Sequence, residues 1–155
     1  MVAGCGFHLR LHQAQLRTQY PVIILPSSGS LTLHQALLRA LDASAVRVLD
    51  KPSPKIDYPQ LVVAAQTLTV QPLVYGPDSE LRRERLKLNV TFNFGTSKGP
   101  ITSFELSTER DRQLNSNQHL GDNAEKVLIE QEMQADIIGQ CLRFIANHHA
   151  AHLPR

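Results

Sequence analysis

The sequence predicts an α+β domain in which two helices pack on one face of a four-stranded, mostly antiparallel sheet. Leucines that recur at helical spacing, and a broad apolar stripe near the C-terminus, predict the two amphipathic helices. Between them, a stretch of alternating apolar and polar side chains is typical of an antiparallel strand with one buried face. The element order is β-α-β-β-β-α. Both helices can cover one face of such a sheet, which leaves its other face open.

The N-terminal half is predicted to alternate extended segments with a helix. A β-rich run over residues 20–25 ends at a proline and a serine-rich turn. Leucines at helical spacing then predict a helix over residues 31–43, with Ser30 or Thr32 available as the N-cap. Alternating valines at residues 45–50 are compatible with a further short strand there.

Three long strands are predicted to follow as a meander, over residues 61–74, 85–94 and 101–108. The second is the clearest, because apolar residues alternate with charged and polar ones along its whole length. Five apolar residues of the first strand are expected to share its core face: Val62, Ala64, Leu68, Val70 and Val74.

A long helix is predicted after a polar loop at residues 110–119. Asp122 or Asn123 is expected to cap it, and it ends near Asn147. Its apolar stripe includes Cys141, and a free cysteine in that setting acts as a small hydrophobe.

Length and composition fit one globular domain. The chain has 155 residues, of which 42% are hydrophobic and 19% charged. The formal net charge of +2 is too small to indicate nucleic acid binding. No apolar run approaches the roughly 20 residues that span a bilayer, so membrane attachment would have to come from lipid. We expect four regions: a signal remnant at residues 1–4, an N-terminal tether at 5–19, a single α+β domain at 20–147 and a tail at 148–155.

The N-terminal segment Val2-Ala3-Gly4-Cys5 has the pattern of a bacterial lipoprotein processing site. An aliphatic residue and two small residues precede a cysteine, and cleavage before Cys5 would free its amine. The thiol then takes a diacylglycerol and the amine a further acyl chain. Each buried methylene contributes about 0.8 kcal/mol, so three chains anchor a protein firmly.

Three blocks of the sequence resemble the LptE (RlpB) family of outer-membrane lipoproteins, which act in lipopolysaccharide assembly. The first is Cys5-Gly6-Phe7-His8-Leu9-Arg10. The second is the leucine-rich helix and valine strand at residues 37–49. The third leads from Glu125 and Glu132-Met133 into residues 140–145. The blocks occur in the family's order, and the length matches.

The resemblance implies a protein on the periplasmic side of the outer membrane, held as a plug inside the LptD β-barrel. It implies a role in assembling that barrel and binding to lipopolysaccharide, with neither a cofactor nor catalysis. Two positions depart from the family pattern. Glu84-Arg85 stands where members often have glutamate and tyrosine. Gly121-Asp122 stands where some carry a lysine, and Lys126 is the next lysine along the chain.

The densest positive cluster runs from Arg82 to Lys87. On a strand, Arg83, Arg85 and Lys87 point to one side at a spacing of about 7 Å, and we call these three residues the cationic ladder. Guanidinium groups suit phosphate, so we expect the ladder, with Arg82 and Lys126, to contact the phosphates or inner-core acids of lipopolysaccharide. The alternative is a solvated sheet face on which Glu105 or Glu80 partners these cations.

Other sequence patterns are weaker candidates for a functional site. The turn at residues 25–30 could present helix N–H groups to an anion, but a capped turn explains it better. His148, His149 and His152 lack a neighbouring carboxylate or thiol to complete a metal site. There is no His-Glu-x-x-His and no phosphate-cradling glycine loop. Two alternatives stay open: an envelope lipoprotein that binds another ligand or partner, and a small periplasmic hydrolase.

Overall fold

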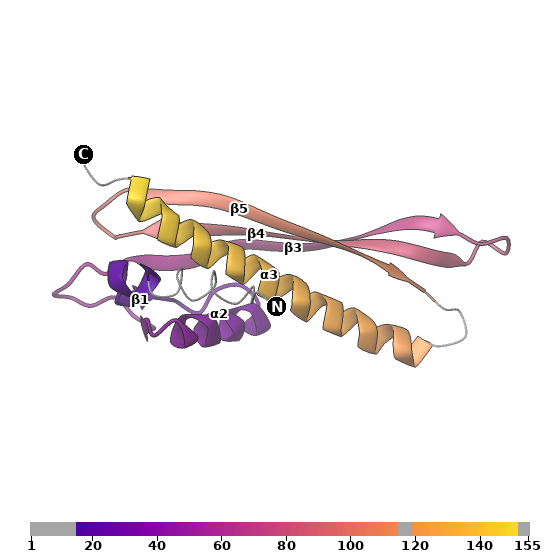
Figure 1. Cartoon of the computed structure of the whole chain (residues 1–155), viewed down its shortest axis with the longest axis horizontal. Coiled ribbons are helices and arrows are strands. Elements are labelled where there is room, and N and C mark those ends of the chain that lie inside the picture. The colour runs from indigo at the N-terminus through magenta and orange to yellow at the C-terminus, as the bar shows by residue number, and fades with distance from the viewer. Residues whose placement is uncertain (1–14, 115–118, 152–155) are drawn as a thin grey trace, which may run out of the picture.

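The computed structural model describes residues 15–114 and 119–151. Its elements, after a helical segment at residues 15–19, are β1 (Val22–Ile24), α2 (Leu31–Ala43), β2 (Arg47–Leu49), β3 (Gln60–Tyr75), β4 (Leu81–Gly95), β5 (Ile101–Gln113) and α3 (His119–Ala151) (Figure 1). The predicted α+β class is confirmed.

The sheet has five strands in the order β2-β1-β3-β4-β5, so the predicted count of four is wrong. It is also mixed. β1 pairs in parallel with β2 and β3, while β3, β4 and β5 are antiparallel. The fifth strand is the short valine segment that the sequence left open. It pairs in parallel with β1 because α2 carries the chain back across the sheet, as a strand–helix–strand crossover requires.

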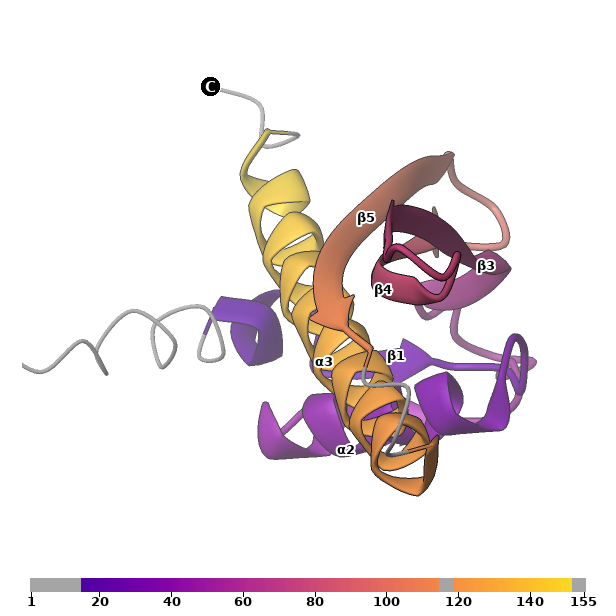
Figure 2. The same cartoon turned by 90° about the vertical axis from the view of Figure 1, so that its right-hand side faces the viewer.

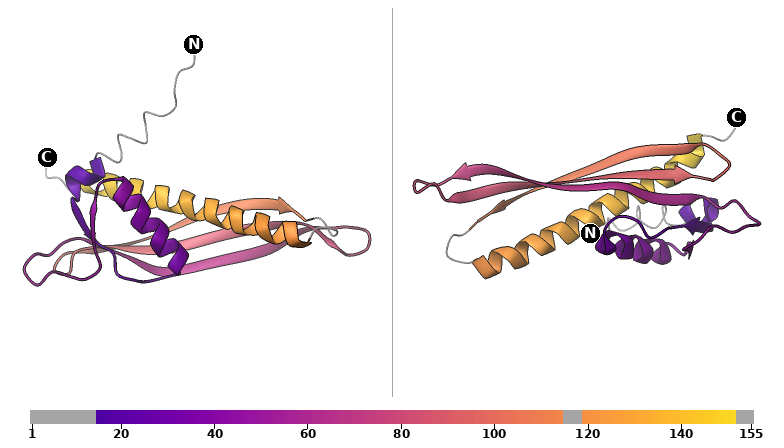
Figure 3. Two further views of the ribbon diagram at one scale, coloured as in Figure 1. Left: turned by 90° about the horizontal axis from the view of Figure 1, so that it is seen from below. Right: turned by 180° about the vertical axis from the view of Figure 1, so that it is seen from behind.

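Helices α2 and α3 share one hydrophobic core with the same face of the sheet (Figure 2). A third helical segment, which the sequence did not predict, lies at residues 15–19 and contributes Leu16 to this core. Figure 3 shows α3 running diagonally along the long strands, with α2 beside it. Among the described residues, no helix packs on the opposite face of β3, β4 and β5.

The core follows the alternation in β4. Leu86, Leu88, Val90, Phe92 and Phe94 are all buried, as the period-two pattern predicts. From α3, four residues one turn apart enter the same cluster: Met133, Ile137, Cys141 and Ile145.

The predicted core face of β3 is wrong over part of its length. A bulge between Val63 and Ala65 shifts the register against β4. One extra residue moves the side chains that follow it to the other face, so Leu68 and Val70 lie on the core side, and a second register shift after Pro72 places Val74 on the open side. Val62 and Val74 instead lie on the open side, opposite polar residues of β4.

The boundaries around the last connection also differ from the prediction. β5 continues through Gln113 and α3 begins at His119, so residues 110–113 and 119 of the expected polar loop belong to a strand and a helix. α3 also continues to Ala151, into the expected tail. Its first half carries exposed apolar side chains, with Val127 53% and Leu128 60% exposed. Among the described helices, none has both the length and the apolar character needed to cross a membrane.

Gly29 is required by the close contact between the β1–α2 turn and β3. Its φ is +75°, and a Cβ atom would lie 2.8 Å from Cγ1 of Val63. The Gly29→Ala variant is therefore expected to lose about 1–3 kcal/mol of stability, measured as the free energy of unfolding in urea. Gly139→Ala is the control. It lies inside α3 with only a flexible arginine tip nearby, so it should gain about 0.5–1 kcal/mol. Equal effects at both positions would contradict this reason.

Candidate functional site

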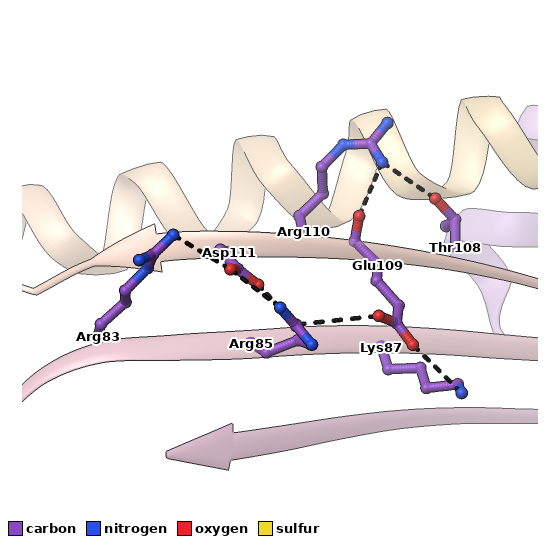
Figure 4. Close-up of polar contacts among 7 residues, drawn as sticks. All are labelled: Arg83, Arg85, Lys87, Thr108, Glu109, Arg110 and Asp111. Atoms are coloured by element: carbon purple, nitrogen blue, oxygen red, sulfur yellow. Dashed lines mark hydrogen bonds and ion pairs between the residues drawn. The ribbon is translucent and has the colours of Figure 1, made fainter. Parts of the chain in front are cut away.

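The cationic ladder lies on the open face of the sheet, as its spacing predicts. β4 alternates, so the buried residues Leu86 and Leu88 point to the core and the ladder points away from it. The side chains of Arg83, Arg85 and Lys87 are 50%, 40% and 45% exposed. Figure 4 shows them in a row along β4.

Acidic residues of β5 pair with every member of the ladder (Figure 4). Arg85 donates from Nε and Nη2 to the two carboxylate oxygens of Asp111, at 2.7 and 3.2 Å. Arg83 reaches the same carboxylate at 3.3 Å. Glu109 lies 3.2 Å from Nζ of Lys87 and 3.8 Å from Nε of Arg85. Positive and negative groups therefore alternate across the two strands.

The ion pairs fix the charge state of the cluster. The hydrogen bond from Arg85 holds the pKa of Asp111 below its usual value, and the same bond raises the pKa of Arg85. Both groups therefore stay ionised at neutral pH. Three cations and two carboxylates leave the cluster with a net charge of +1.

The two sides of the ladder differ. On the β5 side stand the acidic partners. On the β3 side, Val74, Gln71 and Thr69 lie opposite Arg83, Arg85 and Lys87. Within the described chain, no hydrogen bond engages Nη1 of Arg85, so the edge of this guanidinium that Asp111 does not use remains available. An anion can therefore approach the ladder from the solvent side of the open face or from the side of β3.

The partners differ from those the sequence suggested. Glu105 forms no ion pair within the described residues, and Glu80 binds Arg82 at 2.6 Å, near the hairpin turn. Asp111 was overlooked because the sequence placed it in a loop, whereas it lies within β5. Its separation from Arg85 along the chain is 26 residues, and only the strand register brings them together.

The other candidate cations do not join the ladder. Arg82 is 57% exposed at the start of β4 and pairs with Glu80. Lys126 lies on α3, which packs on the opposite face of the sheet, and its ammonium is 3.9 Å from Glu130. Cys5, the predicted lipidation site, lies outside the described residues.

A buried ion pair joins β4 to β5 on the core side of the sheet, next to the ladder along both strands. Nε of Arg112 donates to Glu84 at 2.6 Å, and the two residues are 8% and 6% exposed. Glu84 stands between Arg83 and Arg85 on β4, and Arg112 follows Asp111 on β5. Glu84 lies two residues before the buried Leu86, so the alternation of β4 predicts that Glu84 also points inward. The sequence did not predict its partner, because residue 112 was assigned to a loop.

The chain also contains a Gly-x-Ser-x-Gly pattern at residues 95–99, which the sequence prediction missed. In hydrolases this motif lies between a strand and a helix. Here it forms the turn between β4 and β5, and the hydroxyl of Ser97 donates to Asp57 at 2.6 Å. Asp57 also accepts the backbone N–H groups of Ser97 and Lys98, so it anchors this turn.

The remaining candidates have structural roles. Ser30 caps α2, and Ser28 accepts the N–H of Val63, so the turn after β1 uses its hydroxyls internally. Burial raises the pKa of the Cys141 thiol, which makes it a poor nucleophile. His148 contacts Thr102 and Phe144, while His152 lies outside the described residues. Across the described chain, no group of three metal-binding side chains converges.

A groove of about 710 Å³ separates α2 from α3 on the helical side. Its lining includes Arg39, the hydroxyl of Thr32, several glutamines and alanines, and Gly139. Within the described part of the chain, it has no carboxylate, imidazole or thiol in its lining. It offers no set of acid, base and nucleophile.

Solved structures with this fold come from several bacteria. Rare lipoprotein B from Shewanella oneidensis is 19% identical over 84% of this chain and 97% of that chain, with a TM-score of 0.73. Uncharacterized lipoprotein B from Nitrosomonas europaea is 18% identical over 85% and 86%, with a TM-score of 0.70. A minor lipoprotein from Acinetobacter baumannii is 22% identical over 84% and 93%, with a TM-score of 0.66. At these identities the similarity shows the shared fold.

None of the curated protein sequences compared with this chain matches it significantly. A family model described as "LptE: Lipopolysaccharide-assembly" does match, over residues 22–145, from β1 into the last turns of α3. The resemblance inferred from the sequence blocks is thereby confirmed, and this protein belongs to the LptE family of lipopolysaccharide assembly.

Proposed function

We propose that this protein is a lipid-anchored component of the outer-membrane lipopolysaccharide translocon, on the periplasmic side. Acyl chains on Cys5 would hold it in the membrane, and the folded domain would plug the LptD β-barrel, help assemble it and bind lipopolysaccharide. Membership of the LptE family supports this role. The processing pattern before Cys5 supports the anchor.

The open sheet face is suited to the inside of a barrel. The lumen of an outer-membrane β-barrel is polar, so a plug needs a polar surface. Outward positions of β4 and β5 supply one, with Asn89, Asn93, Ser103 and Ser107 beyond the ladder. The domain is also elongated along β3, β4 and β5 (Figure 1), as a body that enters a pore would be.

The cationic ladder is the observation that carries the proposed binding to lipopolysaccharide. Lipid A carries phosphates, and guanidinium groups bind phosphate through parallel N–H donors. Arg85 keeps one edge of its guanidinium outside the bonds to Asp111. All three side chains are partly exposed, on a sheet face that no helix within the described part of the chain covers.

Replacing Arg83, Arg85 and Lys87 together with serine is expected to weaken lipopolysaccharide binding by about tenfold or more, because charge-assisted contacts are lost. The affinity should also depend less on salt, since fewer cations remain to be screened. Binding of purified lipopolysaccharide would be measured at two salt concentrations.

The matched control replaces Arg39, Arg47 and Lys51 with serine. These exposed residues carry the same three charges but lie on α2, β2 and the loop after β2. The control should bind almost as tightly as the wild type, with only a small effect of the lower net charge. Loss of affinity in both variants, or in neither, would refute binding through the ladder.

The anchor and the barrel partner have a separate test. The full-length protein would be purified from outer membranes with its acyl chains intact. Its mass would then be measured, and the proteins that co-purify with it would be identified. An acylated Cys5 and co-purified LptD are expected, and a Cys5→Ala variant should lose the acyl mass. An unmodified thiol, or purification without a barrel protein, would contradict the proposal.

A further inference from the structure

We propose that Asp111 and Glu109 set the affinity of the cationic ladder for phosphate groups. Each carboxylate occupies cations that a phosphate would otherwise take, and gives them up when the phosphate binds. This inference rests on the proposed function, because that function assigns lipopolysaccharide phosphates to the ladder.

The geometry makes the carboxylates direct competitors of a bound anion. Asp111 binds both Arg83 and Arg85, and Glu109 lies within ion-pair distance of both Arg85 and Lys87. Every cation of the ladder therefore already has a carboxylate oxygen within 3.3 Å. A phosphate can add to the unused edge of Arg85, but it can take the full set of donors only by replacing Asp111 and Glu109.

The exchange is easy because the pairs are exposed. The side chains of Asp111 and Glu109 are 26% and 44% exposed, so water compensates a released carboxylate. Exposed ion pairs of this kind contribute little to stability. A phosphate carries up to two negative charges and three acceptor oxygens, so it competes well for a guanidinium.

The carboxylates also limit the net charge that the ligand meets. With both present the cluster carries +1, and without them it would carry +3. A site in a transport pathway must release what it binds, and a bare row of three cations would hold a phosphorylated glycolipid more tightly. Asp111 and Glu109 thus act as positioning residues that keep the binding reversible.

The test compares three variants that each remove one negative charge from the same face of β5. Asp111→Asn and Glu109→Gln alter the ladder's partners. Glu105→Gln is the matched control, because Glu105 lies outward on β5 opposite Thr91, four residues before Glu109. Lipopolysaccharide and inorganic pyrophosphate serve as probes, and affinity, dissociation rate and salt dependence are measured for each.

Asp111→Asn and Glu109→Gln are expected to bind both probes about three- to tenfold more tightly, with slower dissociation and a steeper salt dependence. Glu105→Gln should change affinity less than about twofold. In the serine-substituted ladder, Asp111→Asn should have no effect, because the cations that it frees are gone. Urea unfolding of each variant checks that the fold is unchanged, and a merely structural role would not steepen the salt dependence.

The two proposals can fail separately. Unchanged or weaker binding in Asp111→Asn and Glu109→Gln, with lipopolysaccharide still bound through the ladder, would overturn the role of the carboxylates alone. Tighter pyrophosphate binding in these variants, in a protein that does not bind lipopolysaccharide, would support their role and refute the proposed ligand.

Discussion

Replacing Glu84 with leucine is expected to destabilise the protein by about 3–5 kcal/mol, the largest effect we predict for a charged residue. Glu84 and Arg112 are 6% and 8% exposed, and 2.6 Å separates Oε1 of Glu84 from Nε of Arg112. Leucine removes the carboxylate that accepts from Nε of this buried guanidinium. A charge that is withdrawn from water and loses its counter-charge is costly in a core.

The double variant Glu84→Leu/Arg112→Leu distinguishes this reason from simple loss of contacts. With both charges removed, most of the lost stability should return, because two leucines can pack against each other and against Leu86 on the core face. Chemical unfolding in urea gives the free energies of the wild type, both single variants and the double variant. A double variant as unstable as Glu84→Leu would contradict an uncompensated charge as the cause.

Glu80→Leu provides the matched control for burial. Glu80 also pairs with an arginine at 2.6 Å, but its partner Arg82 is 57% exposed and Glu80 is 26% exposed. Water compensates an exposed arginine that loses its partner, so the loss of stability should be much smaller than for Glu84→Leu. The same substitution at the same pairing distance thus compares a buried ion pair with an exposed one.

The buried pair also bears on the candidate site. Glu84 and Arg112 are cross-strand partners, and the adjacent pair on the open face is Arg85 with Asp111. Locking the first pair fixes the register that creates the second. Glu84→Leu is therefore expected to weaken lipopolysaccharide binding as well, although Glu84 itself faces the core. Restored stability in the double variant should restore that binding.

Replacing Phe92 with alanine is expected to cost about 3–5 kcal/mol. Phe92 is fully buried, and its ring stacks on Phe104 with a centroid distance of 5.6 Å. Phe104 in turn stacks on Phe144 of α3 at 3.9 Å. Truncation leaves a cavity where β4, β5 and α3 meet, and removes aromatic contacts beyond the lost burial.

Ile101→Ala is the control for this prediction. Ile101 lies at the start of β5 and is 66% exposed, so its truncation should change stability by less than about 0.5 kcal/mol. Thermal and urea unfolding would be compared for both variants. If Phe92→Ala cost no more than Ile101→Ala, the aromatic stack would not be what joins α3 to the sheet.

The predicted features that depend on local pattern are found in the structure. The alternation from Leu86 to Phe94 correctly gave β4 a buried and an open face, because period two is a property of the strand itself. Leucine spacing correctly predicted α2, with its buried Leu33, Leu37 and Leu41, because helical periodicity is also a property of the segment itself. The outward direction of the ladder follows from the alternation in β4.

Predictions failed where distant parts of the chain decide the outcome. The bulge after Val63 depends on how β3 pairs with β4, and it exchanges the faces of the residues that follow, up to a second register shift after Pro72. The polarity of residues 110–113 suggested a loop, yet pairing with β4 extends β5 through them. The parallel pairing of β1 with β2 depends on the path of α2, which no single segment encodes.

By itself, the sequence determined which side chains of β4 and α2 face the core, the helices α2 and α3, the resemblance to the LptE family and the position of the cationic ladder. Periodicity and local blocks carry this information, since both are set by neighbouring residues. Only the tertiary structure decided what the ladder meets. Asp111 is 26 residues from Arg85 and Arg112 is 28 from Glu84, and strand register alone brings each pair together. The charge balance of the site is therefore a property of the folded sheet, because the ion pairs of the ladder join β4 to β5.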